Sequence, residues 1–299
     1  MESREGGERR REKRVVDRWT RKGPLQDLYS QGALLSEGGF GCVYEGFRKA
    51  DGLPVAIKYV SKMQAKQTID MYHPTSCQHH LPLLPSQDRL IPREVALMKL
   101  VNPVPASPHI VQLIEWFDLC TEFAIVLERP YPCQDLLDFI TDRGYNLTED
   151  EARKVMLQVL EALRTCQDRG VVHRDLKPDN LLIQTNTLQV KLIDFGCATY
   201  LKDTPYNDFE GTEIYFPPEW FLQKQYLAGP ATVWSFGVTL YTVLHSHLPF
   251  PGRDEIVKHI LVIRPEISDT CRHLILWCLE PQAANRPTLE QMEHHPWFH

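Results

Sequence analysis

The sequence has no long apolar run and no large excess of charge of one sign. No stretch of its 299 residues approaches the roughly 18 consecutive apolar residues that a membrane-spanning helix requires. The N-terminus is polar and charged where a secretory signal would carry an apolar segment. We therefore expect no membrane contact. We also expect the eight cysteines to be reduced thiols in the cytoplasm, with the nucleus as an alternative location.

The composition is that of a folded chain. A hydrophobic content of 43% is enough for one large core or two smaller lobes. The net charge is −6, although residues 1–22 contain nine Lys and Arg against five Asp and Glu, so the acidic excess belongs to the rest of the chain. An acidic body suits a basic peptide substrate, but mild acidity that only favours solubility remains an equal alternative.

The chain divides into a charged leader and one domain. The leader is rich in Arg and Glu, and we predict that it is disordered. Its basic run at residues 9–14 could be a nuclear or nucleic-acid signal, but we favour a plain solvated tail and expect no nucleic-acid partner. We assign the leader to residues 1–24 and the domain to 25–299, with a small lobe at 25–129 and a large lobe at 130–299.

Secondary-structure patterns differ between the two lobes. Short segments rich in Val, Ile, Tyr and Phe predict strands of an antiparallel sheet at 33–35, 42–44, 55–57, 110–113 and 124–127. After Pro130, helical periods dominate, and the clearest helix has a capping box at Thr148 and Glu151 and ends at Gly170. The patterns predict an α+β fold, with a sheet and one main helix in the small lobe and a mainly helical large lobe.

One stretch of the large lobe carries residues suited to phosphoryl transfer. The string HRDLKPDN occupies residues 173–180, and Asp194 begins the string Asp-Phe-Gly fourteen residues after Asn180. Phosphoryl transfer needs a carboxylate to orient the attacking hydroxyl, a cation on the moving group and oxygen ligands for Mg²⁺. We assign the first two roles to Asp175 and Lys177, and the metal ligands to Asn180 and Asp194. The stretch resembles the catalytic and metal-binding motifs of protein kinases.

The small lobe supplies a matching phosphate site. The segment SEGGFGCV at residues 36–43 resembles the kinase glycine-rich loop, whose glycines let backbone N–H groups approach phosphates. Lys58 would contact the α and β phosphates of ATP, and Glu94 would be its partner from the helix, although an exposed Glu94 is the alternative. We expect ATP to be bound by Leu35, Ser36, Glu37, Gly38, Gly39, Phe40, Gly41, Val43, Ala56, Lys58, Leu127, Glu128, Asp135 and Leu182.

Residues after the catalytic loop indicate which hydroxyl is phosphorylated. Lys177, combined with Gly211-Thr212 ahead of Pro217-Pro218-Glu219, resembles serine/threonine kinases, in which this threonine hydroxyl bridges the catalytic Asp and Lys. Glu219 should be buried, and Arg286 can be its bidentate structural partner.

A long insertion at residues 61–89 separates Lys58 from the helix of Glu94. Four side chains in it have spacings that zinc could use, but its prolines and polar content favour an exposed loop of unknown role. The four are His73, Cys77, His79 and His80.

The resemblance narrows to the Pim serine/threonine kinases. Residues 127–140, LERPYPCQDLLDFI, are similar to the hinge of that family, and the likeness runs from about Leu25 to the end of the chain. Pro130 stands where most kinases donate a backbone N–H to adenine, and proline has none. Losing that hydrogen bond should weaken nucleotide binding by about 0.5 to 1.5 kcal/mol. Thr232 replaces an aspartate that most kinases have, a replacement that the Pim family shares.

The resemblance also implies a substrate class. Asp135 would hold the ribose or a substrate arginine, and Asp138 and Asp179 would receive basic residues upstream of the phosphorylated Ser or Thr, near Thr212. Carboxylates that only favour a helix start are the alternative for Asp135 and Asp138. We expect a monomer that acts on basic protein substrates.

Two further expectations concern activity. Arg174 could find a carboxylate among Asp203, Asp208 and Glu210, so by family analogy we expect basal activity without phosphorylation. The competing class is a pseudokinase or scaffold that binds partners without phosphoryl transfer, supported only by Ser36 and Pro130.

Overall fold

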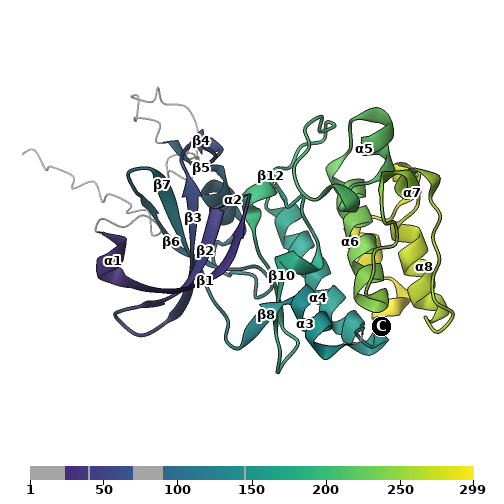
Figure 1. Cartoon of the computed structure of the whole chain (residues 1–299). Coiled ribbons are helices and arrows are strands. Elements are labelled where there is room, and N and C mark those ends of the chain that lie inside the picture. The colour runs from purple at the N-terminus through teal and green to yellow at the C-terminus, as the bar shows by residue number, and fades with distance from the viewer. Residues whose placement is uncertain (1–23, 40, 70–89, 145) are drawn as a thin grey trace, which may run out of the picture.

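A sheet lobe and a helical lobe follow one another along the chain (Figure 1). The computed structural model describes residues 24–39, 41–69, 90–144 and 146–299. The charged leader, Phe40 and most of the insertion lie outside these ranges. The architecture is the predicted α+β fold, with the sheet in the first half of the chain.

The small lobe is built on a five-stranded antiparallel sheet in the order β1-β2-β3-β7-β6. Val55, Ile57 and Ile125 are buried on the central strands, where β-branched side chains pack well. The strand expected at 110–113 is wrong in its bounds: Ile110 instead forms a bridge to Leu192 of the large lobe. A one-turn helix α1 (Leu25–Leu28) precedes the strands, which are β1 (Tyr29–Gly38), β2 (Gly41–Arg48), β3 (Pro54–Ser61), β6 (Leu113–Asp118) and β7 (Glu122–Glu128).

Helix α2 (Arg93–Val101) lies between the sheet and the large lobe (Figure 1). It follows directly on a two-stranded antiparallel ladder of β4 (Gln67–Ile69) and β5 (Leu90–Pro92). Val95, Leu97 and Met98 are buried in the main core. Because the helix begins at Arg93, Glu94 lies in its first turn, where its side chain is also buried.

The large lobe is mainly helical, as predicted. Helix α4 begins at the expected capping box, where Thr148 and Glu151 bond each other's backbone N–H groups, and the chain leaves it through Gly170 with φ +70°. Helix α6 is apolar around most of its circumference and is the central buried helix. The helices are α3 (Leu136–Arg143), α4 (Glu149–Asp168), α5 (Pro218–Gln223), α6 (Ala228–His245), α7 (Arg253–Lys258), α8 (Asp269–Cys278) and α9 (Leu289–Glu293).

Two small ladders hold the segments that carry the catalytic motifs. One has the order β11-β10-β8 and the other pairs β12 with β9. The HRDLKPDN segment therefore runs from the end of β9 to the start of β10, and Asp194 follows β11 closely. Their strands are β8 (Cys133–Asp135), β9 (Val171–Val172), β10 (Leu181–Gln184), β11 (Val190–Leu192) and β12 (Thr199–Tyr200).

The ion pair between Glu219 and Arg286 is present as predicted. Arg286 Nη1 lies 2.8 Å from Glu219 Oε1, and Nη2 lies 2.7 Å from Oε2. The guanidinium is fully buried and stacks 4.8 Å from the ring centroid of Trp234 on α6. The pair therefore fixes the first turn of α5 to the centre of the lobe, because removing one partner would leave an uncompensated buried charge.

His245 at the end of α6 makes the stability of the large lobe sensitive to pH. Its Nδ1 lies 2.9 Å from the Tyr241 carbonyl oxygen, and its Nε2 accepts the Arg264 N–H at 3.2 Å. This arrangement requires the neutral ring. Burial lowers the pKa of His245, and the Arg264 charge lowers it further.

We predict that the free energy of unfolding decreases as pH falls from 7.5 to 5.5. The neutral ring is favoured in the native state, so its contribution is complete above the ordinary pKa of about 6.5 and is lost as pH falls below it. Urea unfolding of wild type and His245→Gln at both pH values measures the effect, and wild type should lose more stability than the variant. Equal losses would contradict the assignment.

Candidate active site

The ammonium of Lys58 joins three elements of the two lobes. Its Nζ lies 2.7 Å from Glu94 Oε1 on α2 and 2.8 Å from Asp194 Oδ1, which follows β11. Lys58 and Glu94 are both buried, and the Asp194 side chain retains 29% exposure. Glu94 therefore points inward, and the alternative of an exposed helix residue is wrong.

Lys58 and Asp194 stabilise each other's charges in this cluster. Burial alone would lower the pKa of Lys58, but the carboxylates of Glu94 and Asp194 outweigh it and raise that pKa above its ordinary value. Burial likewise acts to raise the pKa of Asp194, but the neighbouring Lys58 charge outweighs it and lowers that pKa. Lys58 is therefore cationic and Asp194 anionic at neutral pH.

A second cluster surrounds the carboxylate of Asp175. Lys177 Nζ donates to the Thr212 hydroxyl at 2.7 Å, and that hydroxyl donates to Asp175 Oδ1 at 2.7 Å. The Thr212 backbone N–H also donates to Oδ1 at 2.9 Å. Asn180 Nδ2 donates to Asp175 Oδ2 at 2.8 Å. Three hydrogen bonds thus fix the orientation of one buried carboxylate, and the threonine hydroxyl forms the bridge to Lys177 that was expected from the sequence.

Gly211 allows Thr212 to approach Asp175. Its φ is +118°, and a Cβ at this position would lie 2.5 Å from the Arg174 carbonyl oxygen and 3.2 Å from Asp175 Oδ1. Any other residue would therefore displace the backbone that brings Thr212 to the catalytic loop.

His173 connects the two clusters. Its Nε2 lies 2.8 Å from the Ile193 carbonyl oxygen, next to Asp194, and its Nδ1 accepts the Asp175 N–H at 3.3 Å. The ring packs edge-on against Phe195 with a centroid separation of 5.0 Å. Burial lowers the pKa of His173, which favours the neutral ring that this pattern requires. We did not expect this role, because the sequence does not show which backbone groups the imidazole contacts.

Strand register brings together most residues expected around a nucleotide. Ser36 pairs with Val43, and Val43 pairs with Lys58 on β3. Ala56 pairs with Leu127 on β7. In the large lobe, Leu182 pairs with Asp135. Phe40 lies outside the described residues.

A pocket lies at the junction between these elements. Its lining includes Gly39 of the glycine-rich segment, Glu94 of α2 and Gly196 beside Asp194. The pocket therefore connects the expected phosphate loop to the Lys58 cluster.

Comparison with known proteins identifies the family to which this chain belongs. The family model described as protein kinase domain matches residues 29–298. The chain belongs to the protein kinase family.

The curated relatives of this kinase include proteins named as serine/threonine-protein kinases. The chain is 43% identical over 279 residues to serine/threonine-protein kinase pim-2 of Danio rerio, covering 92% of the chain and 86% of that protein. It is 36% identical over 273 residues to serine/threonine-protein kinase prk-2 of Caenorhabditis elegans, covering 90% of the chain and 58% of that protein. It is 31% identical over 289 residues to NUAK family SNF1-like kinase 1 of Mus musculus, covering 94% of the chain and 40% of that protein. The chain is thus a serine/threonine protein kinase similar to the Pim enzymes, as the motifs predicted.

Two residues of the kinase offer oxygen ligands suited to Mg²⁺. Asn180 uses its Nδ2 for Asp175, which leaves the amide oxygen available. Oδ1 of Asp194 accepts hydrogen bonds from the Lys58 ammonium and from the Gly196 N–H. No described residue donates a hydrogen bond to Oδ2 of Asp194. One carboxylate and one amide oxygen beside a phosphate site fit a hard dication. No cluster of three or more His, Cys, Asp or Glu side chains suited to a metal occurs in the described ranges, and the four possible zinc ligands of the insertion lie outside them.

Three carboxylates of the kinase gather beside the catalytic loop. Asp135 accepts the Asp138 N–H at 2.8 Å as the N-cap of α3, so the helix-start alternative is correct for one of its oxygens. Burial raises the pKa of Asp135, and the nearby charges of Asp138 and Asp179 raise it further. Asp138 and Asp179 are exposed. The three carboxylates therefore form an acidic surface. Their negative charges repel one another, and a bound cation would reduce that repulsion.

Arg174 has a carboxylate partner in the segment that precedes Thr212. Its Nη1 lies 2.7 Å from Asp208 Oδ2, and its Nε donates to the Cys197 carbonyl oxygen at 2.8 Å. The Arg174 side chain is almost fully buried. Asp208 is thus the partner among the three carboxylates considered from the sequence.

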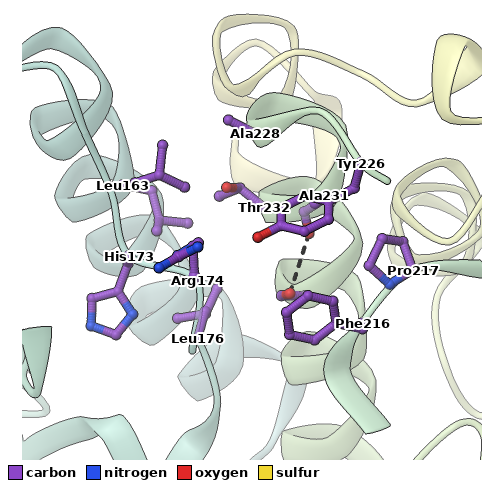
Figure 2. Close-up of a pocket in the computed structure, with 12 residues that line it drawn as sticks. Leu163, His173, Arg174, Leu176, Phe216, Pro217, Tyr226, Ala228, Ala231 and Thr232 are labelled. Carbon is purple, nitrogen blue, oxygen red and sulfur yellow. Dashed lines mark hydrogen bonds between the residues drawn. The ribbon is translucent and has the colours of Figure 1, made fainter. Parts of the chain in front are cut away.

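A small cavity marks the place of the replaced aspartate (Figure 2). Thr232 and Ala231 of α6 face Leu163, Arg174 and Leu176 across it. The short side chain of Thr232 does not fill the space beside the catalytic loop. Ser235, also on α6, donates its hydroxyl to the Tyr215 carbonyl oxygen at 3.0 Å. In place of an aspartate contact, the loop is held by hydrogen bonds to Thr212, Ile193 and Asp208.

We predict that Thr212→Val lowers kcat about tenfold to a hundredfold, the effect of losing a hydrogen bond to charged partners. Thr212→Ser is the matched control, because it keeps the hydroxyl between Lys177 and Asp175 and should retain most activity. Steady-state kinetics of both variants, with thermal unfolding to confirm folding, provide the measurement. If both variants lost activity equally, the bridging hydroxyl would not be the cause.

Proposed function

We propose that this protein transfers the γ-phosphoryl group of ATP to Ser or Thr in Arg-rich substrates, and that it does so without phosphorylation of the segment that precedes Thr212. The observation that carries the proposal is the simultaneous formation of two clusters: Lys58 with Glu94 and Asp194, and Asp175 with Thr212 and Lys177. Both are required for phosphoryl transfer in protein kinases. Their coexistence supports an active arrangement and disfavours a scaffold.

Each residue has a chemical role in this proposal. Lys58 binds the α and β phosphates, and Glu94 orients its ammonium. Asp175 orients the substrate hydroxyl and accepts its proton, while Lys177 neutralises charge on the moving phosphoryl group. Mg²⁺, bound through Asn180 and Asp194, would supply charge neutralisation at the phosphates.

The adenine end of the site depends less on hydrogen bonds. Pro130 has no N–H to donate, so the carbonyl oxygen of Glu128 and the apolar side chains Leu35, Val43, Ala56, Leu127 and Leu182 would provide most of the contacts. The Glu128 side chain is engaged elsewhere: its Oε1 accepts the Gln112 N–H at 2.8 Å and pairs with Lys191. The hinge is therefore held in place by contacts that do not use the backbone carbonyl.

A phosphate-transfer assay with wild type and Asp175→Asn tests the enzymatic function. We expect kcat to fall at least about a hundredfold in the variant, because general base assistance is lost. Asp168→Asn at the exposed end of α4 is the control and should retain full activity. A wild-type protein that binds ATP but transfers no phosphate would favour the pseudokinase alternative.

The acidic surface supports the preference for basic substrates. Asp135 is partly committed to capping α3, whereas the carboxylates of Asp138 and Asp179 are exposed to solvent. An arginine fork on such carboxylates forms directional, charge-assisted hydrogen bonds. Arginines upstream of the phosphorylated residue are therefore the expected ligands.

We predict that Asp138→Ala or Asp179→Ala lowers kcat/KM for an Arg-rich peptide about tenfold to a hundredfold, corresponding to the loss of one charge-assisted hydrogen bond. The same variants should change kcat/KM little for a peptide in which those arginines are Ala. Asp168→Ala controls for the change in net charge. Equal losses on both peptides would refute the assignment.

Contacts of Arg174 support activity without phosphorylation. In its 2.7 Å pair with Asp208, a carboxylate of the protein itself neutralises the buried guanidinium. The segment before Thr212 therefore has an anionic partner for Arg174 without an added phosphate.

The remaining expectations concern location and assembly. No helix in the described residues is long and apolar enough to span a membrane. We propose a cytoplasmic monomer, with the nucleus as the alternative location, a single domain at 25–299 after the leader at 1–24, and a lobe boundary at residue 129. The sheet ends at Glu128 and β8 begins at Cys133, which is consistent with that boundary.

A further inference from the structure

Lys66 contacts both the first residue of α2 and the segment that precedes Thr212. Lys66, directly before β4, forms an ion pair with Glu210. The carbonyl oxygen of Lys66 also accepts the Arg93 N–H at 2.6 Å, at the first residue of α2. Lys66 therefore links α2 to Glu210 through one backbone and one side-chain contact.

Glu210 lies at a sensitive position in the sequence. It is two residues before Thr212, whose backbone N–H and hydroxyl both contact Asp175. The Glu210 side chain is only 17% exposed. The ring of its neighbour Phe209 packs against that of Phe216 with a centroid separation of 4.6 Å. The segment before Thr212 is therefore held by the ion pair of Glu210 and by the ring packing of Phe209.

Charge balance makes this pair more important than an isolated surface ion pair. Lys66, Arg93 and Arg174 lie near one another, and the buried Nη2 atoms of both arginines have no hydrogen-bond partner among the described residues. Burial lowers the pKa of Lys66, and the charges of Arg93 and Arg174 lower it further. Of the described carboxylates, Asp208 and Glu210 are the two that pair with members of this basic group. Without Glu210, three cations would face a single carboxylate.

We propose that Glu210 is a positioning residue, whose ion pair with Lys66 fixes the segment before Gly211 to the base of α2. The pair acts at both catalytic clusters, because one end adjoins the helix of Glu94 and the other adjoins Thr212. The inference rests on the proposed kinase function and identifies what maintains its active arrangement. The pocket between the lobes is lined by Lys66, Arg93, Glu94 and Glu210, in agreement with this connection.

Exchanging the two charges tests the proposal. The full chain is prepared as wild type, Lys66→Glu, Glu210→Lys and the double variant, each treated with phosphatase. We expect each single variant to lower kcat about tenfold, in the range of coupling energies for networked ion pairs, with little change in the KM for ATP. The double variant should recover to within about threefold of wild type. Unchanged single variants, or a double variant no better than the worse single one, would overturn the proposal.

Further measurements separate this inference from the proposed function. If phosphatase-treated wild type had less than about a hundredth of the activity of the phosphorylated form, the proposed activity without phosphorylation would be wrong. The same four proteins in phosphorylated form would then decide the role of Glu210. Hydrogen exchange of residues 207–213 gives an answer that does not depend on catalysis. Exchange should be faster in both single variants and restored in the double variant, and equal exchange in all four proteins would overturn the proposal.

Discussion

The buried ammonium of Lys58 is the contact on which the rest of the site depends. A buried charge is costly unless it is paired, and this one has partners from α2 and from the segment after β11. Both partners are needed in one place, so the position of α2 and that of Asp194 are linked. The contact of Lys58 with Asp194 therefore reports the relative arrangement of the two lobes, whereas its pair with Glu94 is an interaction within the small lobe.

The large lobe provides a firm base for this arrangement. Arg286 fixes Glu219 to the centre of the lobe, and His173 joins the backbone of the catalytic loop at Asp175 to that of Ile193. Thr212 reaches Asp175 only because Gly211 adopts a positive φ. Catalytic geometry thus depends on backbone contacts and on ion pairs that never touch the substrate. The segment before Thr212 has its own carboxylates for its basic neighbours, with Asp208 paired to Arg174 and Glu210 to Lys66.

Local sequence predicted much of the fold because its signals are local. The capping box of Thr148 and Glu151 and the glycine after α4 define that helix by themselves. The strand near Ile110 was misplaced because apolar β-formers alone do not show whether a residue pairs within the sheet or, as Ile110 does, with Leu192. The sequence left two interpretations of Asp135 open: the N-cap of a helix, or part of an acidic site for a substrate. The structure has features of both, because Asp135 caps α3 and other carboxylates lie near it.

The sequence by itself determined the family of this protein and the residues on which the proposed chemistry rests: the carboxylate, the lysines, the threonine and the proposed metal ligands follow from motifs with fixed spacing. Tertiary structure alone decided which distant charges meet. Asp208 rather than Asp203 pairs with Arg174, and Lys66 pairs with Glu210 across more than a hundred residues. The physical reason is that ion pairs between elements depend on how sheet, helix and loop pack together, and one-dimensional spacing contains no information about that packing.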